Sequence, residues 1–444
     1  MFAVGEFRAI YVAGTLSWVG DYLARAAVTA LVYQMTDSAM YSAAAFAISY
    51  APWLLGGSLL VALAERYPYR TVMIICDVLR MVLMAAVAIP HLEPPAMLGL
   101  LLGAALLTPP FDAARSATLP TILEGDRYVV GVAIHATTAQ PAQIVGYLLG
   151  GALATAYDPR WALVINSATF AISAILVRWG VRLRKPALTA DRRTHLLAET
   201  ADGFRLVFRT PALRAIALVV FGAALFVVVP EGLAAAWAAD LTDGSDSGWI
   251  QGMIMAAVPL GWILGGLSVS RLVPPRTRRR LIRPFAIFAP LALVPAVTSP
   301  DASVVAVLAG LCGFAMGGLV PVANGLFVRA LPDAYRARAF GVMQGGLALL
   351  QGRALLVTGA LASRFSLPVV VGLWSLGGVF LMTLLSARWP SAHLFDQATA
   401  AAHAANGHQP VEGRLATPRL PNQGGVSSAA PAPAVILPPG TMET

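Results

Sequence analysis

Four ionisable residues lie inside long apolar segments, where a charge is costly to place. Asp21 and Arg25 stand four residues apart in one segment, Glu231 lies in a second and Arg353 in a third. Ionisable residues inside membrane-type segments usually mark ion or substrate pathways. Asp21 and Arg25 share one helix face at this spacing, so they either neutralise each other locally or act on a proton or ligand.

Glu231 is the strongest candidate for exchanging a proton, and Asp21 is the second. Burial of a carboxyl group favours its neutral form, whereas a nearby arginine such as Arg25 or Arg353 favours the carboxylate. The charge of Glu231 would therefore respond to its surroundings. We expect these charges to line a cavity for the proton and the substrate, and three polar residues are further candidates for it. His135 is either a proton relay or a hydrogen-bonded core histidine. Gln143 and Gln351 are candidate hydrogen-bond partners of a substrate.

The composition is that of an integral membrane protein. Of the 444 residues, 58% are hydrophobic and 12% are charged, whereas soluble domains carry about 25% charged residues. The single lysine, Lys185, follows arginine and precedes proline, so it does not belong to a phosphate-binding Walker loop. Cys76 and Cys312 are far apart in apolar runs, and the histidines lack metal-ligand spacing. We therefore expect no enzyme, cofactor or metal site.

Apolar stretches long enough to span a bilayer, roughly 20 residues each, recur about twelve times. They lie near 9–34, 40–64, 71–91, 96–118, 129–156, 161–182, 214–239, 248–272, 281–298, 302–330, 336–363 and 367–388. The ninth is interrupted by three prolines, which membrane helices tolerate when neighbouring groups satisfy the freed carbonyls.

The arginines alternate strongly between the connecting segments. One set of connections carries many of them: Arg66 and Arg70, Arg127, those from Arg182 to Arg209, those from Arg276 to Arg283, and Arg336 and Arg338. The other set carries Arg160 and Arg364. Positively charged loops stay in the cytoplasm, so both termini are predicted to be cytoplasmic. The net charge of +9 then reflects topology rather than nucleic-acid binding.

The chain contains an internal repeat. Arg8-Ala9-Ile10 matches Arg214-Ala215-Ile216, an offset of 206 residues that also places Arg25 opposite Glu231. The segment PPFDAARSATLP (109–120) similarly resembles PVANGLFVRALP (321–332). Parallel repeats of this kind form transporters whose halves rock about a central site. We expect bundles at 1–183 and 214–388, a cytoplasmic central loop at 184–213 that includes a short amphipathic helix, and a disordered cytoplasmic tail at 389–444.

The segment that joins the second and third predicted spans resembles the loop between helices 2 and 3 of the major facilitator superfamily. That loop reads approximately Gly-x-x-x-Asp-Arg-x-x-Arg-Arg, and this chain has Glu65-Arg66 followed by Arg70 and an Asp-x-x-Arg. Four stretches, GDYLARAAVTALVYQMTDS, AARSATLP, IVGYLLGGAL and RARAFGVMQGG, resemble the branch of enterobactin and macrolide exporters. The resemblance covers about residues 5–388.

The resemblance implies an all-α membrane protein of twelve helices in two pseudo-symmetric six-helix bundles. It also implies a charged gate network on the cytoplasmic side, for which the candidates are Glu65, Arg66, Arg70, Asp77, Arg80, Asp112 and Arg115. Two simpler interpretations remain open: Arg66 and Arg70 act only as topology signals, and Asp112 forms a local ion pair with Arg115.

The function expected from these features is export of small amphipathic molecules, such as drugs, siderophores or secondary metabolites, by proton antiport in the bacterial cytoplasmic membrane. The expected partners are a small-molecule substrate, protons and the lipid bilayer, with no nucleic acid, and the protein is expected to be a monomer. The alternatives are an importer or facilitator of the same fold, and a membrane sensor or scaffold that does not transport.

Overall fold

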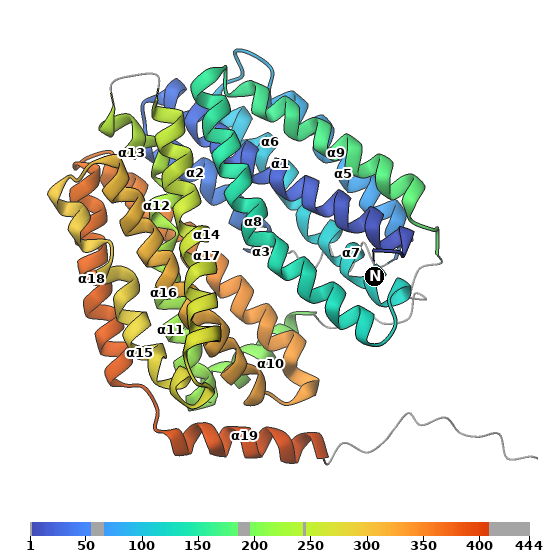
Figure 1. The fold of residues 1–444 in the computed structure, drawn as a ribbon, viewed down its shortest axis with the longest axis vertical. Coiled ribbons are helices and arrows are strands. Elements are labelled where there is room, and N and C mark those ends of the chain that lie inside the picture. The colour runs from blue at the N-terminus through green and yellow to red at the C-terminus, as the bar shows by residue number, and fades with distance from the viewer. Residues whose placement is uncertain (1, 55–65, 185–195, 243–245, 408–444) are drawn as a thin grey trace, which may run out of the picture.

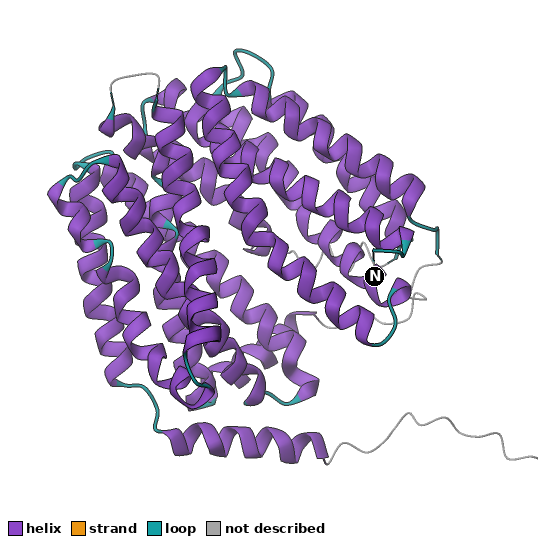
Figure 2. Cartoon of the chain, viewed as in Figure 1, coloured by secondary structure: helices purple, strands orange, loops and turns teal. Residues whose placement is uncertain are grey.

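The computed structural model describes residues 2–54, 66–184, 196–242 and 246–407. The described residues form helices joined by short loops, and none of them is in a strand (Figure 2). Eight helical stretches among them are long and apolar enough to cross a membrane. These are Pro94–Ile122, Arg160–Gly180, Pro211–Gly232, Ser247–Leu272, Thr277–Thr298, Ala302–Arg329, Asp333–Ala362 and Leu367–Ala387. The structure supports a multi-pass, all-helical membrane protein, and the expected number of twelve spans stays a prediction.

The helices before residue 185 pack largely among themselves (Figure 1). They are α1 (Gly5–Thr36), α2 (Ala39–Ala47), η1 (Ile48–Tyr50), α3 (Ala51–Leu54), α5 (Tyr69–Val87), α6 (Pro94–Leu106), α7 (Thr108–Ile122), α8 (Asp126–Ala156) and α9 (Arg160–Gly180). Helix α1 packs along both α8 and α9, and α9 packs along α5. We refer to these helices as the first group.

The helices after residue 195 form the second group. They are α10 (Leu196–Arg209), α11 (Pro211–Val227), α12 (Val229–Gly232), α13 (Ala234–Leu241), α14 (Ser247–Leu272), α15 (Pro275–Leu291), η2 (Val294–Thr298), α16 (Ala302–Arg329), η3 (Asp333–Tyr335), α17 (Arg336–Ala362), α18 (Leu367–Ala387) and α19 (Ala392–Gly407). Helix α16 packs against α14 and α15, and α18 packs against α11 and α15. Helix α10 occupies part of the expected central loop and packs on α17.

Two of the interrupted helical stretches bear on the sites below, and proline lies at both breaks. Pro109 and Pro110 follow the break between α6 and α7, and Pro230 lies in the short α12 between α11 and α13. Proline has no backbone N–H and cannot complete the hydrogen-bond ladder of the preceding turn. Such interruptions at membrane depth are tolerated where they are buried in protein or line a cavity.

The two groups meet along α8 and α14, where glycines allow the backbones to approach. A Cβ atom on Gly151 would lie 2.5 Å from the carbonyl oxygen of Gly248 and 2.7 Å from the Cα of Gly252. Beside this contact, Gln251 Nε2 donates to the carbonyl of Ala26 and to the hydroxyl of Thr29, both at 2.8 Å. Close approach of small residues is a common basis of helix packing in membranes.

This contact lies toward one end of the bundle, which we call the Asp37 end after the turn between α1 and α2. The opposite end, where α1 begins, is the Glu6 end. Helices α2 and α17 also meet across the groups toward the Asp37 end, with Gly359 against Ala43 and Met40. In Figure 1 the two groups converge at the Asp37 end, at the top, and diverge toward the Glu6 end.

The first part of the expected disordered tail is a helix. Helix α19 lies across the second group at the Glu6 end (Figure 1), where Phe395 is buried between Trp389 and the guanidinium of Arg279. Alanine is the strongest helix former and is abundant in 392–407, whereas seven of the eight tail prolines lie beyond residue 407. The expectation of disorder therefore fails for 392–407, and residues 408–444 lie outside the described part.

Replacing Gly151 by alanine is expected to destabilise the contact between α8 and α14. The added Cβ would meet backbone atoms that cannot rotate away, and overpacking of this kind costs about 1–3 kcal/mol. The measurement is the melting temperature of the purified protein in detergent. Gly377→Ala is the matched control, since a Cβ there meets nothing within 4 Å. An unchanged melting temperature for Gly151→Ala would show that the groups are not in contact there.

Candidate functional site

Glu231 lies at the interruption between α11 and α13. Glu231 is 7% exposed and belongs to the four-residue helix α12, which also contains Pro230. Among the described residues, no arginine or histidine nitrogen lies within ion-pair distance of its carboxyl group. A buried carboxyl group without a cation must be stabilised by hydrogen bonds or be neutral.

The hydrogen bonds to Glu231 come from α8 of the first group. The hydroxyl of Tyr147 donates to Oε2 at 3.1 Å, and Nε2 of Gln143 lies 3.4 Å from Oε1 and 3.5 Å from Oε2. Gln143 also donates to the Tyr147 hydroxyl at 3.3 Å. The two donors share one face of α8, because they are four residues apart. Glu231 is thereby linked to the other group of helices.

A cavity of about 130 Å³ lies beside this carboxyl group. Residues of both groups line it: Gln140 and Gln143 of α8, Tyr50 of η1, Trp262 of α14 and Gln351 of α17. The structure thus brings Glu231, Gln143 and Gln351 to one place. Amide, phenol and carboxyl groups on an otherwise apolar wall suit a small molecule that offers both donors and acceptors.

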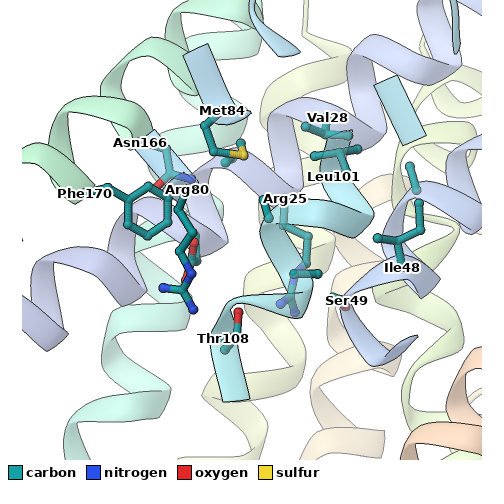
Figure 3. Close-up of a pocket in the computed structure, with 15 residues that line it drawn as sticks. Arg25, Val28, Ile48, Ser49, Arg80, Met84, Leu101, Thr108, Asn166 and Phe170 are labelled. Carbon is teal, nitrogen blue, oxygen red and sulfur yellow. The ribbon is translucent and has the colours of Figure 1, made fainter. Parts of the chain in front are cut away.

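Asp21 and Arg25 line a different cavity, within the first group (Figure 3). The ion pairs of the described residues do not include one between them. The Arg25 guanidinium instead lies over the rings of Tyr22 and Phe46, at 5.1 and 5.3 Å from their centroids. Arg353 is on an exposed face of α17 and lines neither cavity. Glu231 thus lines a different cavity from Asp21 and Arg25, although the charge of Arg25 still acts on Glu231.

Asp77 and Arg80 lie inside the first group and do not pair with each other in the described structure. Asp77 is fully buried, and its Oδ2 accepts a 2.6 Å hydrogen bond from Ser173 of α9. Arg80 is 3% exposed and its guanidinium lies over Phe111 and Phe170, at 5.1 and 5.2 Å. Arg80 lines the cavity of Asp21 and Arg25, which differs from the gate role that the resemblance implies.

Arg115 makes the local ion pair expected from its spacing. Its Nη2 lies 3.0 Å from Oδ1 of Asp112, one helical turn earlier in α7. The guanidinium also lies 5.0 Å from the Trp18 ring, and that ring stacks on His135 at a centroid distance of 4.2 Å. His135 of α8 thus lies against α1 and does not line the cavity beside Glu231, and its Nε2 is buried without a hydrogen bond.

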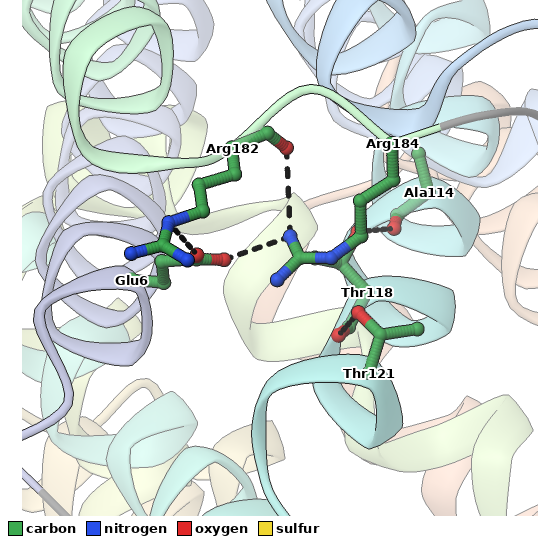
Figure 4. Close-up of polar contacts among 6 residues, drawn as sticks. All are labelled: Glu6, Ala114, Thr118, Thr121, Arg182 and Arg184. Atoms are coloured by element: carbon green, nitrogen blue, oxygen red, sulfur yellow. Dashed lines mark hydrogen bonds and ion pairs between the residues drawn. The ribbon is translucent and has the colours of Figure 1, made fainter.

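The remaining gate candidates lie at the Glu6 end. Arg70 donates to the carbonyl of Arg178, while Arg66 is exposed and Glu65 lies outside the described residues. A separate ion-pair cluster holds the start of α1 to the segment after α9 (Figure 4). Both Arg182 and Arg184 contact Glu6, with N–O distances of 3.3 and 2.7 Å. Arg182 and Arg184 belong to the arginine-rich connection 182–209, from which the orientation in the membrane was predicted.

The sequence did not identify Tyr147, the hydrogen-bond donor nearest to Glu231, as a site residue. A signal was present, because Tyr147 stands one helical turn after Gln143 and so faces the same way. Tyr50 and Trp262 were also missed, and they carried no comparable signal. Among the described residues, no cluster of three histidine, cysteine or acidic side chains is suited to a metal ion.

Interrupted membrane helices around a buried carboxyl group, in a bundle built from two packed groups, are typical of secondary transporters. The model of a family described as the Major Facilitator Superfamily matches residues 10–350. The chain belongs to the major facilitator superfamily, a family of membrane transporters.

One curated relative is the multidrug efflux pump Tap of Mycolicibacterium fortuitum. It is 28% identical over 174 residues, which are 39% of this chain and 41% of that pump. The chain thus matches less than half the length of this relative.

Solved structures with the same fold include that of the nucleoside transporter NupG. Its TM-score is 0.68 and its sequence identity is 14%, and the match covers 87% of this chain and 99% of NupG. The peptide transporter POT has a TM-score of 0.65 and 15% identity, with coverages of 86% and 94%. A bacterial homolog of the human lysosomal transporter Spinster, in an inward-facing and occupied conformation, has a TM-score of 0.64 and 14% identity, with coverages of 90% and 96%. At these identities the likeness concerns the fold.

Tyr147→Phe is expected to lower the stability of the protein by about 1–2 kcal/mol, because it removes a donor from a buried carboxyl group. The measurement is the melting temperature in detergent. Tyr157→Phe is the control, since this tyrosine is 65% exposed and loses the same hydroxyl. Equal melting temperatures for Tyr147→Phe and the control would argue against the hydrogen bond to Glu231.

Proposed function

We propose that this protein exports small amphipathic molecules in exchange for protons, with Glu231 as the proton-binding group. The observation that carries the proposal is the hydrogen bond from Tyr147 of the first group to Glu231 of the second. A neutral carboxyl group donates one proton of its own, whereas a carboxylate only accepts. Gain or loss of a proton therefore changes the contact between two groups that must move against each other in this family.

Direction and orientation are part of the same proposal. The arginine-rich connections lie at the Glu6 end, so this end faces the cytoplasm, with both chain termini, in the bacterial cytoplasmic membrane. The bundle is closed by α8 and α14 at the Asp37 end, which suits a state that accepts its substrate from the cytoplasm. The efflux activity named for the relative Tap agrees with this direction. The transporter acts as a monomer of two six-helix bundles, residues 1–183 and 214–388, joined by the central loop.

Arg66 and Arg70, together with Glu65, contribute to closure at the Glu6 end when the protein turns outward. Asp112 and Arg115 stiffen the first turns of α7, deeper in the bundle, through their ion pair. Asp77 belongs to the same half of the bundle, where it fixes α5 to α9 through Ser173. These are supporting roles, since none of these side chains lines the cavity beside Glu231.

Glu231→Gln is expected to abolish proton-driven transport and to retain exchange of substrate down its own gradient. The amide keeps the size and hydrogen-bonding capacity of the acid and cannot take up a proton. The substrate is first identified by comparing the small molecules retained by cells with and without the gene. Accumulation of that compound is then measured in cells that carry wild type or Glu231→Gln, with and without a protonophore.

Glu124→Gln is the matched control, because Glu124 is exposed in the turn between α7 and α8. It should behave as wild type. Proton-driven transport that persists in Glu231→Gln would contradict the assignment of the acid. A compound depleted from the medium only when the gene is present would reverse the direction and indicate an importer. The absence of any flux, together with intact ligand binding, would indicate a sensor or scaffold.

A further inference from the structure

A second cavity lies inside the first group and is separate from the one beside Glu231. It has a volume of about 140 Å³ and lies among α1, α2, η1, α5, α6, α7 and α9. Figure 3 shows its two kinds of wall. The guanidinium groups of Arg25 and Arg80 are at the same end as the hydroxyls of Thr108 and Ser49, and apolar side chains such as Leu101 lie toward the other end.

Both arginines at this cavity lack an ion-pair partner among the described residues. Arg80 is 3% exposed, and its Nε and Nη2 atoms are buried without a hydrogen bond. Aromatic rings cover the faces of both guanidinium groups, which leaves the N–H edges for other contacts. A buried guanidinium with unsatisfied donors is strongly destabilising unless an acceptor is supplied.

The charges of the cavity wall do not balance. Two arginines, Arg25 and Arg80, and one acid, Asp21, line it. The neighbouring acid Asp77 accepts a hydrogen bond from Ser173 on α9 and does not line the cavity, although its charge and that of Arg80 act on each other. With all three lining groups ionised, the wall has one positive charge more than it has negative charges, which a single anionic group would neutralise.

The size and shape of the cavity restrict the ligand further. Pockets for drug-sized molecules are about 300–1,000 Å³, so a cavity of about 140 Å³ holds a small molecule. Guanidinium forks match carboxylate and phosphate groups with two parallel hydrogen bonds. The apolar end, with Met84 and Leu101 and the ring of Phe170 nearby, would take a hydrocarbon or aromatic body.

We propose that this cavity binds a small amphipathic organic anion, with its acidic group between Arg25 and Arg80 and its apolar body toward Met84 and Leu101. Asp21 sets the affinity by opposing the anion, and the Thr108 and Ser49 hydroxyls lie at the same end as the acidic group. The site shares no lining residue with the cavity beside Glu231, and its binding test does not require transport.

The test uses radiolabelled benzoate and the purified full-length protein in lipid nanodiscs, with unlabelled benzyl alcohol and benzylamine as neutral and cationic competitors. We expect saturable benzoate binding that the two competitors do not displace. Arg25→Gln and Arg80→Gln should each weaken binding by about 10-fold or more, since each removes a charged hydrogen-bond partner. Asp21→Asn should strengthen it, because it removes the opposing charge.

Arg80→Lys keeps the charge and loses the planar fork, so its affinity should fall between those of wild type and Arg80→Gln. It also serves if Arg80→Gln does not fold, which size-exclusion chromatography will show. Arg160→Gln is the control, because it removes an arginine that pairs with Asp158 at the Asp37 end. The proposal is overturned if wild type does not bind benzoate, if Arg25→Gln binds it as well as wild type, or if benzylamine is preferred.

Discussion

A carboxyl group buried at membrane depth without a cation must be held by hydrogen bonds or be neutral, and Glu231 is under this constraint. Its donors, Tyr147 and Gln143, lie on the opposite group of helices, so these hydrogen bonds form only while the two groups are in contact there. The break in the helix at Pro230 is what allows the short α12 to present this side chain to α8. The account of transport rests on this contact.

Helix α8 joins the acid to the contact between the groups. Gln143, Tyr147 and Gly151 recur every four residues and therefore share one face. The first two contact Glu231 and the third packs on Gly248 and Gly252 of α14. The residues that hold Glu231 and the residue that packs on α14 thus lie on the same surface of α8. The cavity that Arg25 and Arg80 line has a different set of lining residues, and Arg25 is the charge that acts on both sites.

The sequence predicted the family and the helical class, because unusual composition is a strong signal, and the role of Glu231 stays a proposal. It did not predict which side chains meet. Arg353 was expected at the site but is exposed. Because α17 is apolar on most of its surface, its sequence does not indicate which face points inward. The i+3 spacing of Asp77 and Arg80 suggested a pair, but the aromatic rings beside Arg80 and the hydroxyl of Ser173 provide other partners. The helix at 392–407 was not predicted, because the prolines that follow it indicated disorder for the whole tail.

The most direct test of the account is infrared difference spectroscopy of the protein as the pH is varied across neutrality. A protonated carboxylic acid has a carbonyl stretch that a carboxylate and an amide lack. The account predicts a titrating band that disappears in Glu231→Gln, shifts in Tyr147→Phe because its hydrogen bond is lost, and persists in Glu124→Gln. Bands from the acids inside the first group, Asp21 and Asp77, are expected to persist in Glu231→Gln. The account would be contradicted if Glu231→Gln removed no titrating band that wild type shows, or if wild type showed no such band.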